Sequence, residues 1–357
     1  MAALPTTTHD LIIIGGGIAG RFCAWNATNR GLRTLLLDPD DARASAAWAS
    51  GGMLAPVAEG LTGGLLEIGL AARAAWPDAI RRLQQQSATP LTLDHGIVVP
   101  LAPETSRAPM AGYLEQMRAR ADIVMLGDEP DALPAQAGFE RAALVRDEFV
   151  VAPRAVLAAL AQATADSVEV VRDKAEQIRV VSGAVHVEGT AAAYTGRSVV
   201  VCAGHRAGLI RGLEPFLPGT VTGERGALLY VRSDNRPPWT IFDHGLTGVT
   251  YLVPTDDGYR IGATADPEDR CRTVRPEEID LLLSRAASLW HDPGAEVVEA
   301  VAGARPVGPL TTGEPLVGPL DPDRRIWGLL GMHRNGILFS PFLADKLIEK
   351  VAVCLSS

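Results

Sequence analysis

One stretch of the sequence decides the fold: Asp10-Leu11-Ile12-Ile13-Ile14-Gly15-Gly16-Gly17-Ile18-Ala19-Gly20, an apolar run that ends in G-x-G-x-x-G. The apolar residues predict a short buried strand. Gly15 permits a tight turn, Gly17 lets the backbone approach a pyrophosphate, and Gly20 allows a helix to pack closely on the strand. The helix that follows would point its free N–H groups and the positive end of its dipole at the phosphates.

A second predicted strand, from Gly31 to Asp38, ends in an acid 23 residues after Gly15. A spacing of about 20 residues places such a carboxylate on a ribose hydroxyl. A glycine turn in another kind of βαβ unit is the alternative, but strand, glycines, helix and acid occur here in the expected order. The sequence therefore predicts a dinucleotide site with Asp38 at the ribose.

Length and charge limit the class of protein. A chain of 357 residues is long enough for two domains or one discontinuous pair. No apolar run approaches the ~18 residues that span a membrane, and Met1 to Asp10 lacks the pattern of a signal peptide, so we expect a cytoplasmic protein without a membrane span. The net charge of −9 argues against a nucleic-acid partner, although it does not exclude a local basic pocket.

The four cysteines, Cys23, Cys202, Cys271 and Cys354, are far apart in the sequence and form no C-x-x-C motif. This pattern is typical of free thiols in a reducing compartment, and it predicts neither a zinc site nor a disulfide framework. We expect Cys23 on the first helix and Cys202 in a strand to be small core residues, and we predict no metal site.

A bend from Ala44 to Pro56 is rich in glycine, alanine and serine, and such small residues let the backbone pass close to a bound group. A flexible linker is the alternative, but Trp48, Met53 and Leu54 provide apolar anchors that a solvated linker lacks.

The remaining pattern alternates strands and helices. Helices are expected over 64–86 and from Pro153 to Ala161, and strands over 95–100, 168–171, 178–181, 184–187 and 198–204. Strands at 227–231, 250–254 and 259–262, with a hairpin turn at Asp256-Asp257-Gly258, predict an antiparallel sheet. A strand over 325–331 precedes a helix that Ser340-Pro341 can cap.

This order of motifs resembles the D-amino-acid-oxidase-like superfamily of FAD enzymes, and most closely its glycine-oxidase-like branch of thiamine biosynthesis. The resemblance extends from about Asp10 to Val351. It depends on the amino-terminal glycines, Ser50-Gly51-Gly52-Met53-Leu54-Ala55-Pro56, Val199-Val200-Val201-Cys202-Ala203-Gly204, Gly262-Ala263-Thr264, Ala302-Gly303-Ala304-Arg305-Pro306 and Gly331-Met332-His333-Arg334-Asn335-Gly336-Ile337.

The resemblance implies a mixed α/β fold with a second, antiparallel sheet. A discontinuous Rossmann-like FAD-binding domain would comprise residues 1–85, 150–222 and 300–357, and a substrate domain capping the flavin would comprise 86–149 and 223–299. We expect non-covalent FAD, because no cysteine lies in the motif where some relatives attach their flavin. The implied cofactor-binding residues are Gly15, Gly17, Ile18, Ala19, Gly20, Asp38, Ser50, Gly51, Gly52, Met53, Ala203, Gly204, Gly331, His333, Asn335, Gly336 and Ile337.

The implied activity is the oxidative deamination of glycine or another small amino acid. A hydride passes from the C–H beside the amine to flavin N5, and molecular oxygen accepts the electrons, giving an imino acid and hydrogen peroxide. Arg305 matches the position that binds the substrate carboxylate, for which a bidentate guanidinium is well suited. Arg334 matches a second arginine beside the substrate, and Tyr251 lies in a strand over the flavin. A surface arginine, a loop charge and an ordinary sheet aromatic are the respective alternatives.

Other features bear on the chemistry. We interpret His333 as a pocket-edge residue and not as a base, because hydride transfer needs only a neutral amine. The helix expected to open near Pro341 would stabilise negative charge on the reduced flavin. Met332-His333 and Ala265 depart from the family pattern, so the resemblance does not identify the exact substrate. A D-amino-acid or N-methyl-amino-acid dehydrogenase with another electron acceptor, an accessory FAD protein acting with a protein partner, and a homo-oligomer also remain open.

Overall fold

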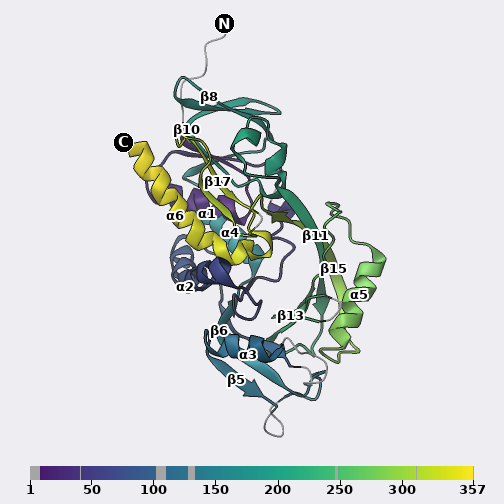
Figure 1. Ribbon diagram of the computed structural model, residues 1–357. Helices are drawn as coiled ribbons and strands as arrows, with labels where there is room; N and C mark the ends of the chain where they lie inside the picture. The colour runs from purple at the N-terminus through teal and green to yellow at the C-terminus, as the bar shows by residue number, and fades with distance from the viewer. Residues whose placement is uncertain are drawn as a thin grey trace.

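The computed structural model describes residues 9–40, 42–101, 110–127, 133–245, 248–310 and 312–356. The described chain forms two sheets (Figure 1). The first lies toward the end of the molecule where the labels β8, β10 and β17 stand, and the second lies toward the opposite end, with β5, β6 and β13. Two long strands, β11 (Thr222–Arg232) and β15 (Glu296–Val307), run from beside the first sheet into the second. This confirms the predicted mixed α/β fold with a second sheet.

The first sheet contains the predicted dinucleotide-binding strands. Its main order is β16 (Leu316–Pro319), β17 (Ile326–Leu330), β10 (Ala193–Val201), β1 (His9–Ile14), β2 (Thr34–Leu37) and β7 (Val168–Val171). All neighbouring pairs are parallel except β16 with β17. Strands β8 (Ala175–Val181) and β9 (Ala184–Gly189) continue from β10 as antiparallel partners. The strands predicted in this region are confirmed.

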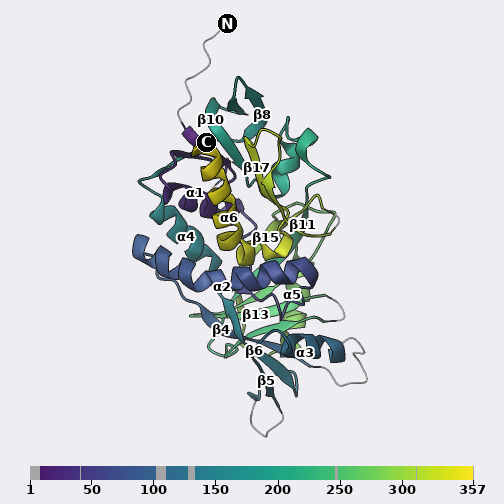
Figure 2. The same cartoon turned by 60° about the vertical axis from the view of Figure 1, so that its left-hand side comes forward.

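Strand β1 is buried on both faces, which explains its unbroken apolar sequence. Leu11 and Ile13 pack into a core formed with helices α1 (Ile18–Thr28), α2 (Gly63–Gln86), α4 (Pro153–Ala163) and α6 (Gly336–Ser356). Ile12 and Ile14 pack on the other face, against residues of β8 and β9. Figure 2 shows α1, α4 and α6 together, with α2 lying next to the second sheet.

Helix α6 corrects one expectation. The predicted start at Ser340-Pro341 is wrong, because the helix begins at Gly336 and includes Pro341. A Ser-Pro pair is typical of a helix start, but here Pro341 is close to the N-terminus and removes only one intrahelical hydrogen bond. The Ser340 hydroxyl donates to the carbonyl oxygen of Gly336 instead of capping. Burial of the apolar residues 337–339 draws this earlier turn into the core.

The second sheet has the order β15, β11, β14 (Gly258–Gly262), β13 (Thr250–Thr255), β12 (Thr240–Asp243), β4 (Asp94–Pro100), β6 (Ala142–Val150) and β3 (Met53–Leu54), and β5 (Ile123–Leu126) pairs with β6. The pairing is antiparallel as predicted, except that β12 and β4 are parallel. Helix α5 (Pro276–Ala287) packs on one face, and α3 (Met110–Arg118) lies near β5 and β6 in Figure 1.

The chain passes between the first and the second sheet several times. Residues 53–54 pair within the second sheet, and β15 continues without interruption across residue 300. The predicted domain boundaries remain a proposal. Among the residues described, no helix has both the length and the apolar character that crossing a bilayer would require.

Candidate active site

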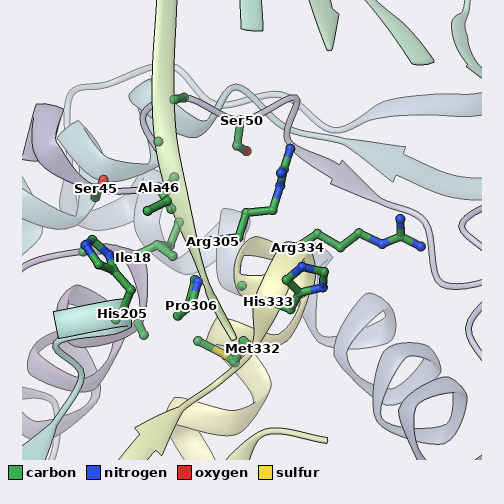
Figure 3. A pocket seen from close by; sticks show the side chains of 18 of the residues that line it. Ile18, Ser45, Ala46, Ser50, His205, Arg305, Pro306, Met332, His333 and Arg334 are labelled. Atoms are coloured by element: carbon green, nitrogen blue, oxygen red, sulfur yellow. The ribbon is translucent and has the colours of Figure 1, made fainter. Parts of the chain in front are cut away.

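A cavity of about 560 Å³ lies where the carboxyl ends of β1, β2 and β10 approach the second sheet. Its lining comes from segments far apart in sequence: the β1–α1 turn, residues 44–47 and 49–53 of the bend, residues 202–206, residues 303–306, and residues 329–334, 336 and 337. Ligands of open parallel sheets bind at this end of the strands. Figure 3 shows how Ser50, Arg305, His333 and Arg334 gather around this cavity.

The glycines of the first turn have two different tasks. Gly15 has a φ of +105°, and a Cβ atom there would lie 2.5 Å from the carbonyl oxygen of Cys202. A Cβ atom at Gly20 would overlap the carbonyl oxygen of Gly15. By contrast, a Cβ atom at Gly17 would meet only the Cβ of Ser45, at 3.6 Å, and Gly17 lines the cavity. Gly15 and Gly20 therefore serve backbone packing, whereas Gly17 leaves the cavity open.

Asp38 directly follows β2 and lines the cavity. Burial raises the pKa of its carboxyl to about 6, although the positive charge of Arg21 opposes this shift. The absence of a side chain at Gly16 makes room for this carboxylate, because a Cβ atom there would overlap Oδ2 of Asp38. The acid therefore stands at the end of the second strand, where the spacing predicts a ribose contact.

Replacing Asp38 with alanine is expected to weaken FAD retention by roughly 10- to 150-fold, since hydrogen bonds to a charged group contribute about 1.5–3 kcal/mol. FAD release followed by fluorescence after gel filtration measures this loss. Asp78→Ala, on an exposed face of α2, is the control. If the Asp38 variant purifies with a full complement of flavin, Asp38 is not at the ribose.

Tyr251 lies on β13 and forms part of the cavity wall. Its ring packs between two glycines: a Cβ atom at Gly51 would lie 2.6 Å from Cε2, and one at Gly262 would overlap the phenol. Burial raises the pKa of Tyr251, so the phenol keeps its proton. A protonated hydroxyl beside the cavity can donate a hydrogen bond.

Arg305 lies near the end of β15, opposite Glu224 on β11. Nη1 donates to Glu224 Oε1 at 3.2 Å and to the carbonyl oxygen of Arg225 at 3.4 Å, and Nη2 donates to that of Thr264 at 3.1 Å. Gly226 leaves the space that this guanidinium needs. A guanidinium has five N–H donors. These three hydrogen bonds therefore fix the orientation of the group and leave two N–H donors for a ligand.

His333 follows Met332 at the edge of the cavity and adopts a φ of +47°, which is uncommon for a residue with a side chain. Its Nε2 lies 3.2 Å from Glu224 Oε1, the oxygen that also accepts from Arg305. Burial lowers the pKa of His333 and outweighs the opposing effect of Glu224. The imidazole is therefore neutral near pH 7.

Arg334 reaches the cavity but is engaged with Glu59. The Nε of Arg334 lies 3.3 Å from Glu59 Oε2, and its Nη2 donates to the carbonyl oxygen of Glu59 at 3.4 Å. In Figure 3 the side chains of Arg305 and Arg334 point in different directions. Burial raises the pKa of Glu59 to about 7, although Arg334 and Arg305 both lower it.

The structure brings most of the predicted site residues to this one cavity. All of them line it except Gly20, which packs behind the turn, and Asn335, which is buried beside it with no hydrogen-bond partner for its Oδ1 among the described residues. Cys23 and Cys202 are buried in the core as predicted, although Cys202 comes directly after β10 and not within it, and their Sγ atoms lie 3.9 Å apart.

Sequence reasoning missed Glu59 and Glu224. The sequence does contain an indication that Glu59 is unusual, because it is the only charged residue between Arg43 and Glu67. A lone charge in an uncharged stretch that follows a cofactor motif indicates a buried site. Glu224 had no comparable signal, because it stands directly beside Arg225 in the sequence and the pair resembles an ordinary surface pair of opposite charges.

The lining fits FAD. Gly17, Gly204 and Gly336 all border the cavity, and a Cβ atom at Gly204 or Gly336 would meet no atom within 4 Å, so the open space lies directly against the backbone. The N-termini of α1 and α6 both border it as well, and helix N-termini bind anionic groups. Asp38 stands at the same end of the cavity as the first turn.

Comparison with known proteins agrees with this geometry. The family described as FAD dependent oxidoreductase matches residues 10–350. A glycine oxidase of Bacillus licheniformis is 28% identical over 96% of this chain and 93% of its own length. The crystal structure of glycine oxidase from Geobacillus kaustophilus superposes with a TM-score of 0.86 at 25% identity, covering 97% of this chain and 94% of that one. An iminodiacetate oxidase from Chelativorans sp. BNC1 shares the fold, with a TM-score of 0.81 at 18% identity over 95% of both chains. The chain therefore belongs to the FAD-dependent oxidoreductase family, and FAD is its cofactor.

Proposed function

We propose that this enzyme oxidises glycine or another small amino acid at the carbon that carries the amine, giving an imino acid and hydrogen peroxide. The observation that carries the proposal is Arg305, whose guanidinium is fixed on the cavity wall with N–H donors still available. A planar pair of donors suits a carboxylate. The protonated Tyr251 phenol on the same wall can add a third donor.

FAD supplies the hydride acceptor of this reaction. Gly17, Ile18 and Ala19 would hold its pyrophosphate, and Asp38 its ribose. The bend that contains Ser50, Gly51, Gly52 and Met53 would lie along the flavin, together with Ala203, Gly204, Gly331, His333, Gly336 and Ile337. The N-terminus of α6 at Gly336, in place of the expected one near Pro341, would stabilise negative charge on the flavin pyrimidine.

Ala265 and Met332 line the cavity and bear on the size of the substrate. A small side chain at position 265 leaves space, which favours substrates up to D-alanine, D-proline or N-methylglycine beside glycine. A dehydrogenase that passes its electrons to another acceptor uses the same substrate contacts. The non-covalent state of FAD, oxygen as acceptor, a cytoplasmic location and a place in thiamine biosynthesis stay predictions.

A screen of the purified yellow protein against glycine, N-methylglycine and small D-amino acids tests the proposal. Flavin bleaching without oxygen reports reduction, and peroxide release in air reports oxygen as the acceptor. We expect both with at least one of these amino acids. Bleaching without peroxide would indicate a dehydrogenase. If no amino acid bleaches the flavin, the proposal is wrong, and an accessory role with a protein partner replaces it.

A further inference from the structure

Glu59 has an unusual place in the cavity. It is the charged residue of a tight turn, in which its N–H donates to the carbonyl oxygen of Ala55 at 2.9 Å. The residue is 8% exposed, yet it lines the cavity close to Arg305 and Tyr251. A carboxylate is seldom buried without a reason, because leaving water is costly unless the charge is paired.

The turn that carries Glu59 is held rigidly from behind. Glu148 on β6, with no solvent exposure, accepts the N–H groups of Val57 at 2.5 Å and of Ala58 at 3.0 Å. The Nη2 of Arg334 donates to the carbonyl oxygen of Glu59 from the opposite side. Glu148 does not line the cavity, so it positions the turn whereas Glu59 presents a carboxylate to the cavity.

One carboxylate oxygen of Glu59 is available. Oε2 is paired with the Nε of Arg334, whereas Oε1 accepts no hydrogen bond within the described part of the chain. The other acid on this wall, Glu224, differs, because its Oε1 is shared between Arg305 and His333. Both acids therefore keep one oxygen without a hydrogen bond among the described residues, but Glu59 is the more buried, at 8% against 23% side-chain exposure, and its carboxylate meets one cation whereas that of Glu224 meets two donors.

The proposed reaction needs such an acceptor. A free amino acid near pH 7 carries an ammonium group, and a carbon beside a cationic nitrogen does not release hydride. We propose that Glu59 accepts the proton of the substrate's ammonium group, with Arg305 holding the carboxylate; this inference rests on the proposed function. One N–H bond of the substrate breaks and one O–H bond forms on Glu59, leaving the neutral amine and a carboxylic acid that returns its proton to water between turnovers.

The surroundings of Glu59 set its proton affinity. The charged and titratable groups that face it are Arg334, Arg305, Tyr251, Glu148 and His244, whose Nε2 lies 2.9 Å from the carbonyl oxygen of Ala58. Burial raises the pKa of Glu59 to about 7, because its effect is larger than the lowering of the pKa by the two arginines. A base works best when its pKa is near the operating pH. Below about pH 7 Glu59 holds a proton and cannot act; above it the carboxylate is present.

The test is the pH profile of kcat/KM for flavin reduction by the best amino acid of the screen. In the parent enzyme the profile is expected to rise through about pH 7. Glu59→Gln keeps the size and removes the base, so at pH 7 kcat/KM should fall by roughly 10²- to 10⁴-fold. That deficit should shrink as the pH approaches the pKa of the substrate's own ammonium group, since the substrate then arrives neutral. Glu67→Gln, an exposed acid on α2, is the matched control.

Two further measurements separate a base from a structural residue. Glu59→Asp keeps a carboxylate and should keep the rising limb at a lower rate, even where Glu59→Gln loses FAD. Infrared titration of the protein without substrate should show a carboxyl group that ionises near pH 7 and is missing in Glu59→Gln.

A deficit of Glu59→Gln that stays constant with pH, or an infrared titration unaltered by this substitution, would overturn the inference while leaving the proposed function intact. A parent enzyme that no amino acid reduces would instead overturn the proposed function, and the inference with it.

Discussion

Arg305→Lys is expected to weaken apparent substrate affinity by roughly 10- to 150-fold, the equivalent of about 1.5–3 kcal/mol for a charge-assisted hydrogen bond. Lysine keeps the positive charge but offers a point charge in place of a planar fork. It also cannot reproduce the three hydrogen bonds that fix the guanidinium to Glu224, Arg225 and Thr264. Anaerobic flavin bleaching at increasing amino-acid concentration measures the effect, and the resting flavin spectrum should not change.

Two further variants serve as controls for Arg305→Lys. Arg232→Lys, an exposed arginine on β11 paired with Glu296, should leave the affinity unchanged. Arg334→Lys should affect it less than Arg305→Lys, because Arg334 is engaged with Glu59. If Arg334→Lys alone causes the loss, the carboxylate is anchored from residues 331–335 and not from β15. Unaltered kinetics of Arg305→Lys toward every substrate would remove Arg305 from the site.

The second large effect separates two glycines of the same motif. Gly20→Ala should lower the free energy of unfolding by roughly 3 kcal/mol or more, because its new Cβ would overlap the carbonyl oxygen of Gly15 and only backbone movement can relieve this. Gly17→Ala should change the stability of the FAD-free protein by about 0.5 kcal/mol at most, since φ at Gly17 is −70° and its Cβ would meet only Ser45.

Gly17→Ala is expected to have a large effect on FAD retention, in contrast to its small effect on stability. The Cβ of Gly17→Ala would project into the cavity where the pyrophosphate is expected, so this folded variant should lose FAD. Urea unfolding of the FAD-free proteins gives the stabilities, and flavin content gives the retention. A Gly17→Ala protein that keeps its flavin would show that the backbone at Gly17 does not approach the cofactor.

The sequence predicted the parts of the structure that depend on local pattern. The first turn, Asp38 and the strands around them follow from apolar runs, glycines and spacing, and the motifs around Arg305 and Arg334 point to one cavity. The start of α6 could not be predicted in this way, because burial of residues 337–339 overrides the Ser340-Pro341 signal. The side-chain contacts across the cavity could not be predicted from the sequence either.

Those pairings decide the chemistry of the site. The sequence gives no means of knowing that Arg334 meets Glu59, 275 residues away, or that Glu224 is shared between Arg305 and His333. Such contacts arise only when β11, β15 and the loop after β17 are brought together. A role assigned to Arg334 from its motif alone therefore omits the acid beside it.

The position of β17 and α6 has a consequence for synthesis. β17 pairs with β10 inside the first sheet, and α6 packs against α1, although both are synthesised long after the strand and the helix that they contact. During synthesis the turn between β1 and α1 therefore emerges from the ribosome while the apolar surfaces of α1 and β10 are still uncovered. Contacts of such long sequence separation form slowly and leave the chain prone to aggregation in the meantime. Because the N-terminus of α6 borders the cavity, we expect the flavin to be retained only after this helix has docked, so the yellow colour of bound flavin should appear late in folding.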